Sequence, residues 1–134
     1  METFTIVGFK KRIDPSLEGQ DIMNLWKQLW SHPNTVEFIK KNIMPVAVYF
    51  EYEGDQTKPY SLIVGFKSEK KIEEFEFLEV PVLQFQEFEK KGTMPQVVFE
   101  CWQDVWDSNI KRAFLYDIEE YLSKDKVKLH ISIL

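Results

Sequence analysis

The same apolar stripe occurs twice in this sequence, and that repetition limits the folds that the chain can adopt. A shift of 76 residues places the helical pattern that begins at Ile22 on the one that begins at Val98. Chance produces some matches in any amphipathic chain, so the duplication is a hypothesis. Both tryptophans nevertheless repeat, and every position stays apolar: Ile22, Met23, Leu25, Trp26, Leu29 and Trp30 fall on Val98, Phe99, Cys101, Trp102, Val105 and Trp106.

Strand patterns surround each of the two predicted helices. The shift of 76 also places Ile6 on Val82 and Phe9 on Phe85, whereas a shift of 68 fits the later strands, because the second connector is shorter. Each half then has the order strand, helix, strand, strand. A short helical turn is expected at 34–41, and the second main helix is expected to begin near Thr93. Alternating apolar residues predict strands at 4–13, 46–52, 60–66, 82–89, 114–121 and 127–133.

These patterns predict an α+β fold with an antiparallel sheet and two main helices. A length of 134 residues suits one domain, so residues 1–134 are expected to fold as a unit. Its two strand–helix–strand–strand modules would comprise about 1–67 and 75–134, related by a pseudo-twofold axis.

Acids lie inside the aromatic strand pattern at 114–121. Because side chains alternate along a strand, Asp117, Glu119 and Tyr121 share one face. The shift of 68 places Glu51 on Glu119, so a groove between the halves would receive an acid from each side. Carboxylates among aromatic rings suit a lipophilic cation. The alternative is an edge strand whose Glu119 meets solvent.

Composition and charge argue against several other functions. With 17 basic and 22 acidic residues the formal net charge is −5, so no broad basic face for nucleic acid is expected. No apolar stretch is long enough to span a membrane and no signal peptide begins the chain, which predicts a cytoplasmic protein. The only cysteine, Cys101, lies among apolar residues and is expected to be buried and inert. Two histidines, His32 and His130, offer no triad or metal cluster, so we expect no metal and no cofactor.

An ordered set of motifs resembles the GyrI-like (gyrase-inhibitor-like) effector-binding domains, which are similar to the ligand domains of multidrug-sensing transcription activators. A strand that ends at Gly65 is followed by Pro81 before a strand and by Gly92 before a helix. Trp102 and Trp106 come next, then Ile118-Glu119-Glu120-Tyr121 and a closing strand at 127–133. Where the family has a bulky aromatic residue before the acid, this chain has Ile118, and no proline follows at Leu122-Ser123.

The resemblance implies a stand-alone binder of bulky lipophilic, cationic aromatic compounds in a groove between the two halves, with Glu119 as the groove acid. No DNA-binding segment is expected before the strand that begins at Phe4, so control of transcription would need a partner chain. Each tryptophan has the alternative of a place in the core. The candidate ligand-binding residues are Glu119, Glu51, Tyr49, Tyr121, Trp26, Trp102 and Trp106.

Two other functions fit the same resemblance. A hydrolase of electrophilic, drug-like compounds would use Glu119 to activate water and Tyr121 to donate a proton. A protein-partner module of the gyrase-inhibitor type would use an acidic surface, which a net charge of −5 supports only weakly. We expect a binder rather than an enzyme.

Overall fold

The computed structural model of the chain describes residues 4–16 and 18–134. This part contains seven strands and three helices, which confirms the predicted α+β class. In chain order the elements are β1 (Phe4–Ile13), α1 (Glu18–Ser31), α2 (Thr35–Lys40), β2 (Val46–Phe50), β3 (Tyr60–Lys67), β4 (Glu76–Val80), β5 (Phe85–Lys91), α3 (Gln96–Asp107), β6 (Arg112–Ser123) and β7 (Lys126–Ile133).

All seven strands form one antiparallel sheet in the order β4-β1-β3-β2-β6-β7-β5. Apart from β4, the strands on the two sides of the β2–β6 pair correspond: β2, β3 and β1 of the first module match β6, β7 and β5 of the second. The pseudo-twofold axis therefore lies between β2 and β6. Phe9 pairs with Val64 in the first module and Phe85 pairs with Ser132 in the second. Those are the positions that the shifts of 76 and 68 residues connect. The register is consistent with an internal duplication, which itself stays a prediction.

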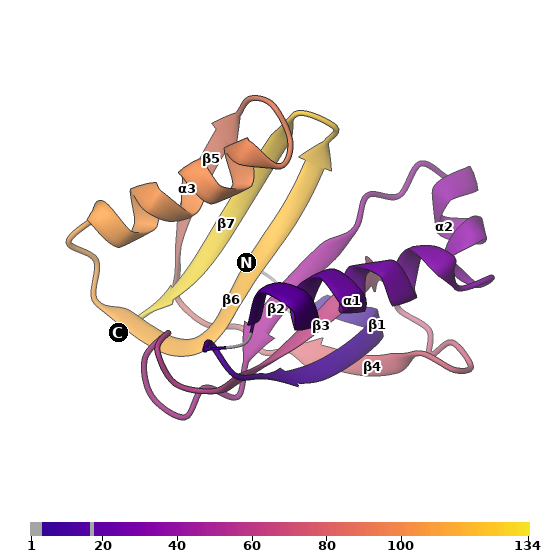
Figure 1. The fold of residues 1–134 in the computed structure, drawn as a ribbon, viewed down its shortest axis with the longest axis horizontal. Coiled ribbons are helices and arrows are strands. Elements are labelled where there is room, and N and C mark those ends of the chain that lie inside the picture. The colour runs from indigo at the N-terminus through magenta and orange to yellow at the C-terminus, as the bar shows by residue number, and fades with distance from the viewer. Residues whose placement is uncertain (1–3, 17) are drawn as a thin grey trace.

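Each module carries its helix on the same face of the sheet (Figure 1). Helix α1 packs on β1 and β3 through the buried Leu25 and Leu29, whereas α3 packs on β5 and β7 through Val97, Cys101 and Val105. The central strands β2 and β6 therefore lie between the two helices. Among the described helices, none is long and apolar enough to cross a membrane.

The other face of the central strands holds a second core. Val48 and Ile118, which pair across β2 and β6, are both fully or almost fully buried there. Side-chain alternation then turns the intervening residues, Ala47 and Tyr49 on β2 and Glu119 on β6, toward the helices. The apolar far face thus fixes the register that presents the acid on the helix side.

The predicted strand at 82–89 is wrong at its beginning. Residues 76–80 form a separate edge strand, β4, that pairs with β1, and β5 begins only at Phe85. Pro81 follows β4 directly, and proline has no N–H to continue a ladder. Helix α3 likewise begins at Gln96 rather than near Thr93, because Pro95 disfavours helical backbone in the residue before it.

Cys101 is buried in the core between α3 and the second half of the sheet, as predicted. Burial raises the pKa of its thiol to about 11. A thiol with that pKa is almost wholly protonated at neutral pH, so Cys101 is a packing residue there and a poor nucleophile.

Gly8 and Gly65 face each other in the β1–β3 pair, where backbone crowds both positions. A Cβ on Gly65 would lie 1.8 Å from the carbonyl oxygen of Val7. We expect Gly65→Ala to lower the free energy of unfolding by about 1–3 kcal/mol or more in urea denaturation. Gly19→Ala is the matched control, because nothing lies near that position in α1. It should be neutral or stabilising by up to about 1 kcal/mol, and equal losses in both variants would contradict the crowding argument.

Candidate functional site

A cleft opens between α1 and α3, above the central strands β2 and β6. It has two adjoining lobes that share Ile22, Tyr49, Phe99 and Trp102. We call the larger one, with a volume of about 490 Å³, the acid lobe, and the smaller one, of about 190 Å³, the arginine lobe. The acid lobe is lined further by Trp26, Trp30, Met44, Pro45, Met94, Pro95, Val98, Glu119, Tyr121, Ser123 and Lys124.

Glu119 lies on β6 in the acid lobe and is 3% exposed. Its Oε2 accepts a hydrogen bond from the Tyr49 hydroxyl at 3.1 Å and another from the Trp102 indole Nε1 at 2.8 Å. The Tyr121 hydroxyl donates to Oε1. The carboxylate thus has three donors, one from each of β2, α3 and β6 itself, and all three are neutral.

The three donors leave Glu119 without a compensating positive charge. Among the residues that the structure describes, no Lys, Arg or His forms an ion pair with it. Burial raises the pKa of Tyr49, and the adjacent Glu119 charge raises it further. Burial and Glu119 raise the pKa of Tyr121 in the same way, so both phenols keep their protons and remain donors.

Asp117, two residues earlier on the same face of β6, has a different environment. It is fully buried, and its Oδ2 accepts from Arg112 at 2.8 Å and from the Tyr52 hydroxyl at 2.5 Å. Its Oδ1 accepts from the backbone N–H of Ser132 at 3.1 Å. A charged partner and further donors satisfy this carboxylate, so Asp117 is a structural acid.

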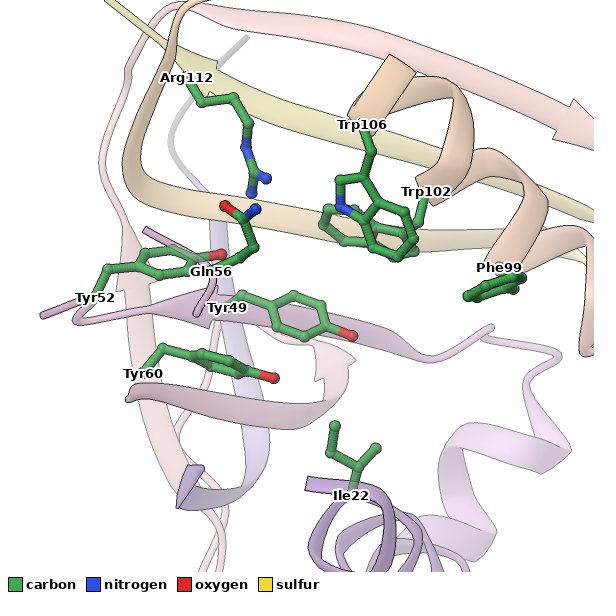
Figure 2. Close-up of a pocket in the computed structure, with 9 residues that line it drawn as sticks. All are labelled: Ile22, Tyr49, Tyr52, Gln56, Tyr60, Phe99, Trp102, Trp106 and Arg112. Atoms are coloured by element: carbon green, nitrogen blue, oxygen red, sulfur yellow. The ribbon is translucent and has the colours of Figure 1, made fainter. Parts of the chain in front are cut away.

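Arg112 and aromatic side chains define the arginine lobe (Figure 2). The guanidinium carbon of Arg112 lies 4.3 Å from the ring centroid of Phe114 and 5.8 Å from that of Trp102. Figure 2 shows the guanidinium and the amide of Gln56, from the β2–β3 loop, turned toward each other. The remaining lining residues are Ile22, Tyr49, Tyr52, Tyr60, Phe99, Trp102 and Trp106.

The structure brings six of the seven predicted site residues into one cleft. Trp102 and Tyr49 line both lobes, Trp106 lines the arginine lobe, and the acid lobe holds the other three, Glu119, Tyr121 and Trp26. Trp26 also packs edge-on against Tyr121 with ring centroids 5.8 Å apart. Trp26 and Trp102 therefore line the cleft in addition to packing against the core, whereas Trp106 is about half exposed. Contact of any of them with a ligand stays a proposal.

Glu51 does not enter the cleft, so its expected convergence with Glu119 is wrong. Its φ of 52° is left-handed, which ends the alternation of β2 and takes its side chain off the face of Tyr49. It forms an ion pair with Lys10 at 3.0 Å and accepts from the Ser61 hydroxyl at 2.7 Å. The Ser61 bond, followed by Lys10, lowers the pKa of Glu51.

Sequence reasoning missed much of the arginine lobe. Arg112 bonds Asp117 across a stretch in which β6 is irregular in its pairing with β7, and no periodic signal marks that irregularity. Tyr52 reaches Asp117 from beyond the end of β2, where strand alternation no longer predicts side-chain direction. Trp30 could have been found, because it repeats as Trp106 under the shift of 76. Gln56 lies in a loop, where sequence patterns carry little information about side-chain position.

The arrangement suits binding better than acid–base chemistry. Three of the roughly four acceptor sites of the Glu119 carboxylate already receive hydrogen bonds, which leaves room for only about one further donor such as water. Tyr121 has a raised pKa and is a reluctant proton donor. Within residues 4–16 and 18–134, no group of three or more His, Cys, Asp or Glu side chains could hold a metal ion.

The sequence model of an integron-associated effector-binding protein family, Cass2, matches residues 1–133. The chain belongs to the Cass2 family. Membership in an effector-binding family supports small-molecule binding, and the resemblance to GyrI-like domains holds in the coarser sense of effector binding. Comparison with curated proteins finds no match.

Solved structures share the Cass2 chain's fold along its whole length. The integron cassette protein VCH_CASS2, from the mobile metagenome of Vibrio cholerae, has 24% identity and a TM-score of 0.86 over 100% of this chain and 92% of its own. SAV2435, solved bound to tetraphenylphosphonium, has 12% identity and a TM-score of 0.73 over 100% and 90%. A putative transcription regulation protein from Staphylococcus aureus has 12% identity and a TM-score of 0.66 over 99% and 94%.

The two acids on β6 predict different effects on stability. Asp117→Asn weakens a buried ion pair and should lower the free energy of unfolding by about 3–5 kcal/mol. Glu119→Gln should change it by less than about 1 kcal/mol, because the amide oxygen can still accept from Tyr49 and Trp102. Urea denaturation followed by circular dichroism measures both. Equal losses would mean that Glu119 is as structural as Asp117.

Proposed function

We propose that this Cass2 protein binds bulky, lipophilic aromatic cations in the cleft between α1 and α3, with Glu119 as the counter-charge. The observation that carries the proposal is the buried carboxylate of Glu119, which has three neutral donors and forms no ion pair with any residue that the structure describes. A buried charge of this kind is costly unless it is paired. A cationic ligand would supply the pair.

The walls of the cleft fit the same class of ligand. Indole and phenol rings offer apolar area to a lipophilic body and attract a positive charge through their faces. Charge delocalised over an aromatic cation is cheap to desolvate compared with an ammonium group. SAV2435, which has this fold, was solved with such a cation, tetraphenylphosphonium. At 12% identity that structure supports the choice of probe and leaves the natural ligand open.

The function predicts that affinity for a lipophilic cation depends on Glu119. We expect tetraphenylphosphonium to bind the unmodified protein saturably. In Glu119→Gln the dissociation constant should rise roughly tenfold or more, which corresponds to a loss of about 1.4 kcal/mol of binding free energy. Isothermal titration calorimetry at fixed ionic strength measures both proteins. Recovery of the ligand unchanged after long incubation would argue against the hydrolase alternative for this compound.

Two controls separate charge in the cleft from charge elsewhere. Glu51→Gln removes one negative charge outside the cleft and should leave affinity within about twofold, since exposed charges are screened. Triphenylphosphine oxide, a neutral aromatic compound, should bind the unmodified protein and Glu119→Gln equally. Equal affinity of tetraphenylphosphonium for the unmodified protein and Glu119→Gln would refute the proposed role of Glu119.

A further inference from the structure

The cleft has one positive charge that no acid of the described chain pairs with. Among the described residues, three charged side chains line its two lobes: Arg112 in the arginine lobe, and Glu119 and Lys124 in the acid lobe. Asp117 balances Arg112 across a 2.8 Å ion pair. Neither Glu119 nor Lys124 forms an ion pair within the part of the chain that the structure describes. The acid lobe therefore carries two unpaired charges of opposite sign.

The lack of an ion pair distinguishes Lys124 from the lysines around it. Three of these have an acid partner: Lys90 with Asp104 at 3.0 Å, Lys91 with Asp125 at 3.7 Å, and Lys126 with Glu89 at 3.4 Å. Asp125, the acid next to Lys124 in the sequence, accepts from the Ser123 hydroxyl at 2.8 Å. That hydrogen bond and Lys91 lower the pKa of Asp125 more than Lys124 does. Lys124 is thus the lysine at this turn that is left for an external partner.

The two unpaired charges lie along one strand, at different places in the same lobe. Glu119, Tyr121 and Ser123 alternate on one face of β6 and all line the acid lobe, and Lys124 follows in the turn to β7 (Figure 1). A strand rises about 3.3 Å per residue, so Ser123 lies roughly 13 Å along β6 from Glu119. Lys124 is exposed as well as lining the lobe, so its ammonium group is accessible to a bound molecule.

We propose that the acid lobe recognises zwitterionic ligands, in which the aromatic cation lies at Glu119 and an anionic tail group, such as a carboxylate or sulfonate, reaches Lys124. The inference rests on the proposed function and narrows its class of ligand. It makes Lys124 a specificity-determining residue, because a ligand without the anion gains nothing from it. The two ligand charges are separated by roughly 13 Å, the distance along β6.

Electrostatics sets the size of the effect and its dependence on tail length. An ion pair with an exposed lysine changes affinity by about two- to fivefold. At a separation of roughly 13 Å, salt weakens the repulsion between the tail anion and Glu119, because the Debye length is about 8 Å at 0.15 M ionic strength. A short tail would instead hold its anion beside Glu119, where the two carboxylates repel each other, and it would not reach Lys124.

A matched pair of phosphonium ions tests the role of Lys124. (9-Carboxynonyl)triphenylphosphonium and its amide, (9-carbamoylnonyl)triphenylphosphonium, have the same rings and the same chain length, but only the first has an anion at neutral pH. Calorimetry gives the ratio of the dissociation constant of the amide to that of the carboxylate. We expect Lys124→Gln to lower this ratio about two- to fivefold, and Lys124→Glu to lower it further, because its charge repels the tail.

Controls separate Lys124 from general charge effects. Lys126→Gln removes the same charge from a lysine that pairs with Glu89 and does not line the cleft, so it should leave the ratio unchanged. The shorter pair, (2-carboxyethyl)triphenylphosphonium and its amide, should show no dependence on Lys124. An unchanged ratio in Lys124→Gln, equal changes in the two lysine variants, or equal dependence for short and long tails would overturn the inference.

Glu119→Gln separates this inference from the proposed function. If both hold, the variant weakens the two long-tailed ions by similar factors and leaves their ratio sensitive to Lys124. Undiminished affinity in Glu119→Gln, with a ratio that still depends on Lys124, would refute the role of Glu119 and support that of Lys124. Dependence on Glu119 without dependence on Lys124 would refute the zwitterion alone. Absence of binding by every ion would refute both.

Discussion

Pairing of β2 with β6 joins the two modules, and the cleft exists because of it. An α-helix with its side chains is about 10 Å wide, whereas adjacent strands are about 4.8 Å apart, so one helix covers about two strands. Helices α1 and α3 each cover two strands of their own module, which leaves the β2–β6 seam between them. Aromatic side chains from both sides line that gap, and its floor is the strand pair itself.

The two acids on β6 show how position on one strand separates structure from binding. Asp117 faces Arg112 and Tyr52, and the resulting network ties β6 to β7 and to the segment that follows β2. Glu119 is one alternation further along and meets only neutral donors. The acid that stabilises the fold, Asp117, and the acid without a cationic partner, Glu119, are therefore two residues apart on one strand. The contacts of Asp117 hold the backbone of β6, and with it Glu119, in place.

The sequence predicted the parts of the molecule that periodicity controls. Both helices, the antiparallel sheet and the twofold arrangement followed from repeated stripes, and Glu119 lies among rings as strand alternation predicted. Glu51 failed because a left-handed residue at a strand end breaks the alternation that the prediction assumed. The edge strand β4 and the place of Arg112 depend on long-range pairing and on a β-irregularity, neither of which leaves a local pattern.

The four tryptophans of the chain all line the cleft. They form two stacked pairs, Trp26 with Trp30 on α1 and Trp102 with Trp106 on α3, with ring centroids 6.2 and 6.3 Å apart. The indole emission of this protein therefore originates at a single location. A compound bound in the cleft would lie close to all four indoles and change their fluorescence together, so tryptophan emission would report whether the cleft is occupied.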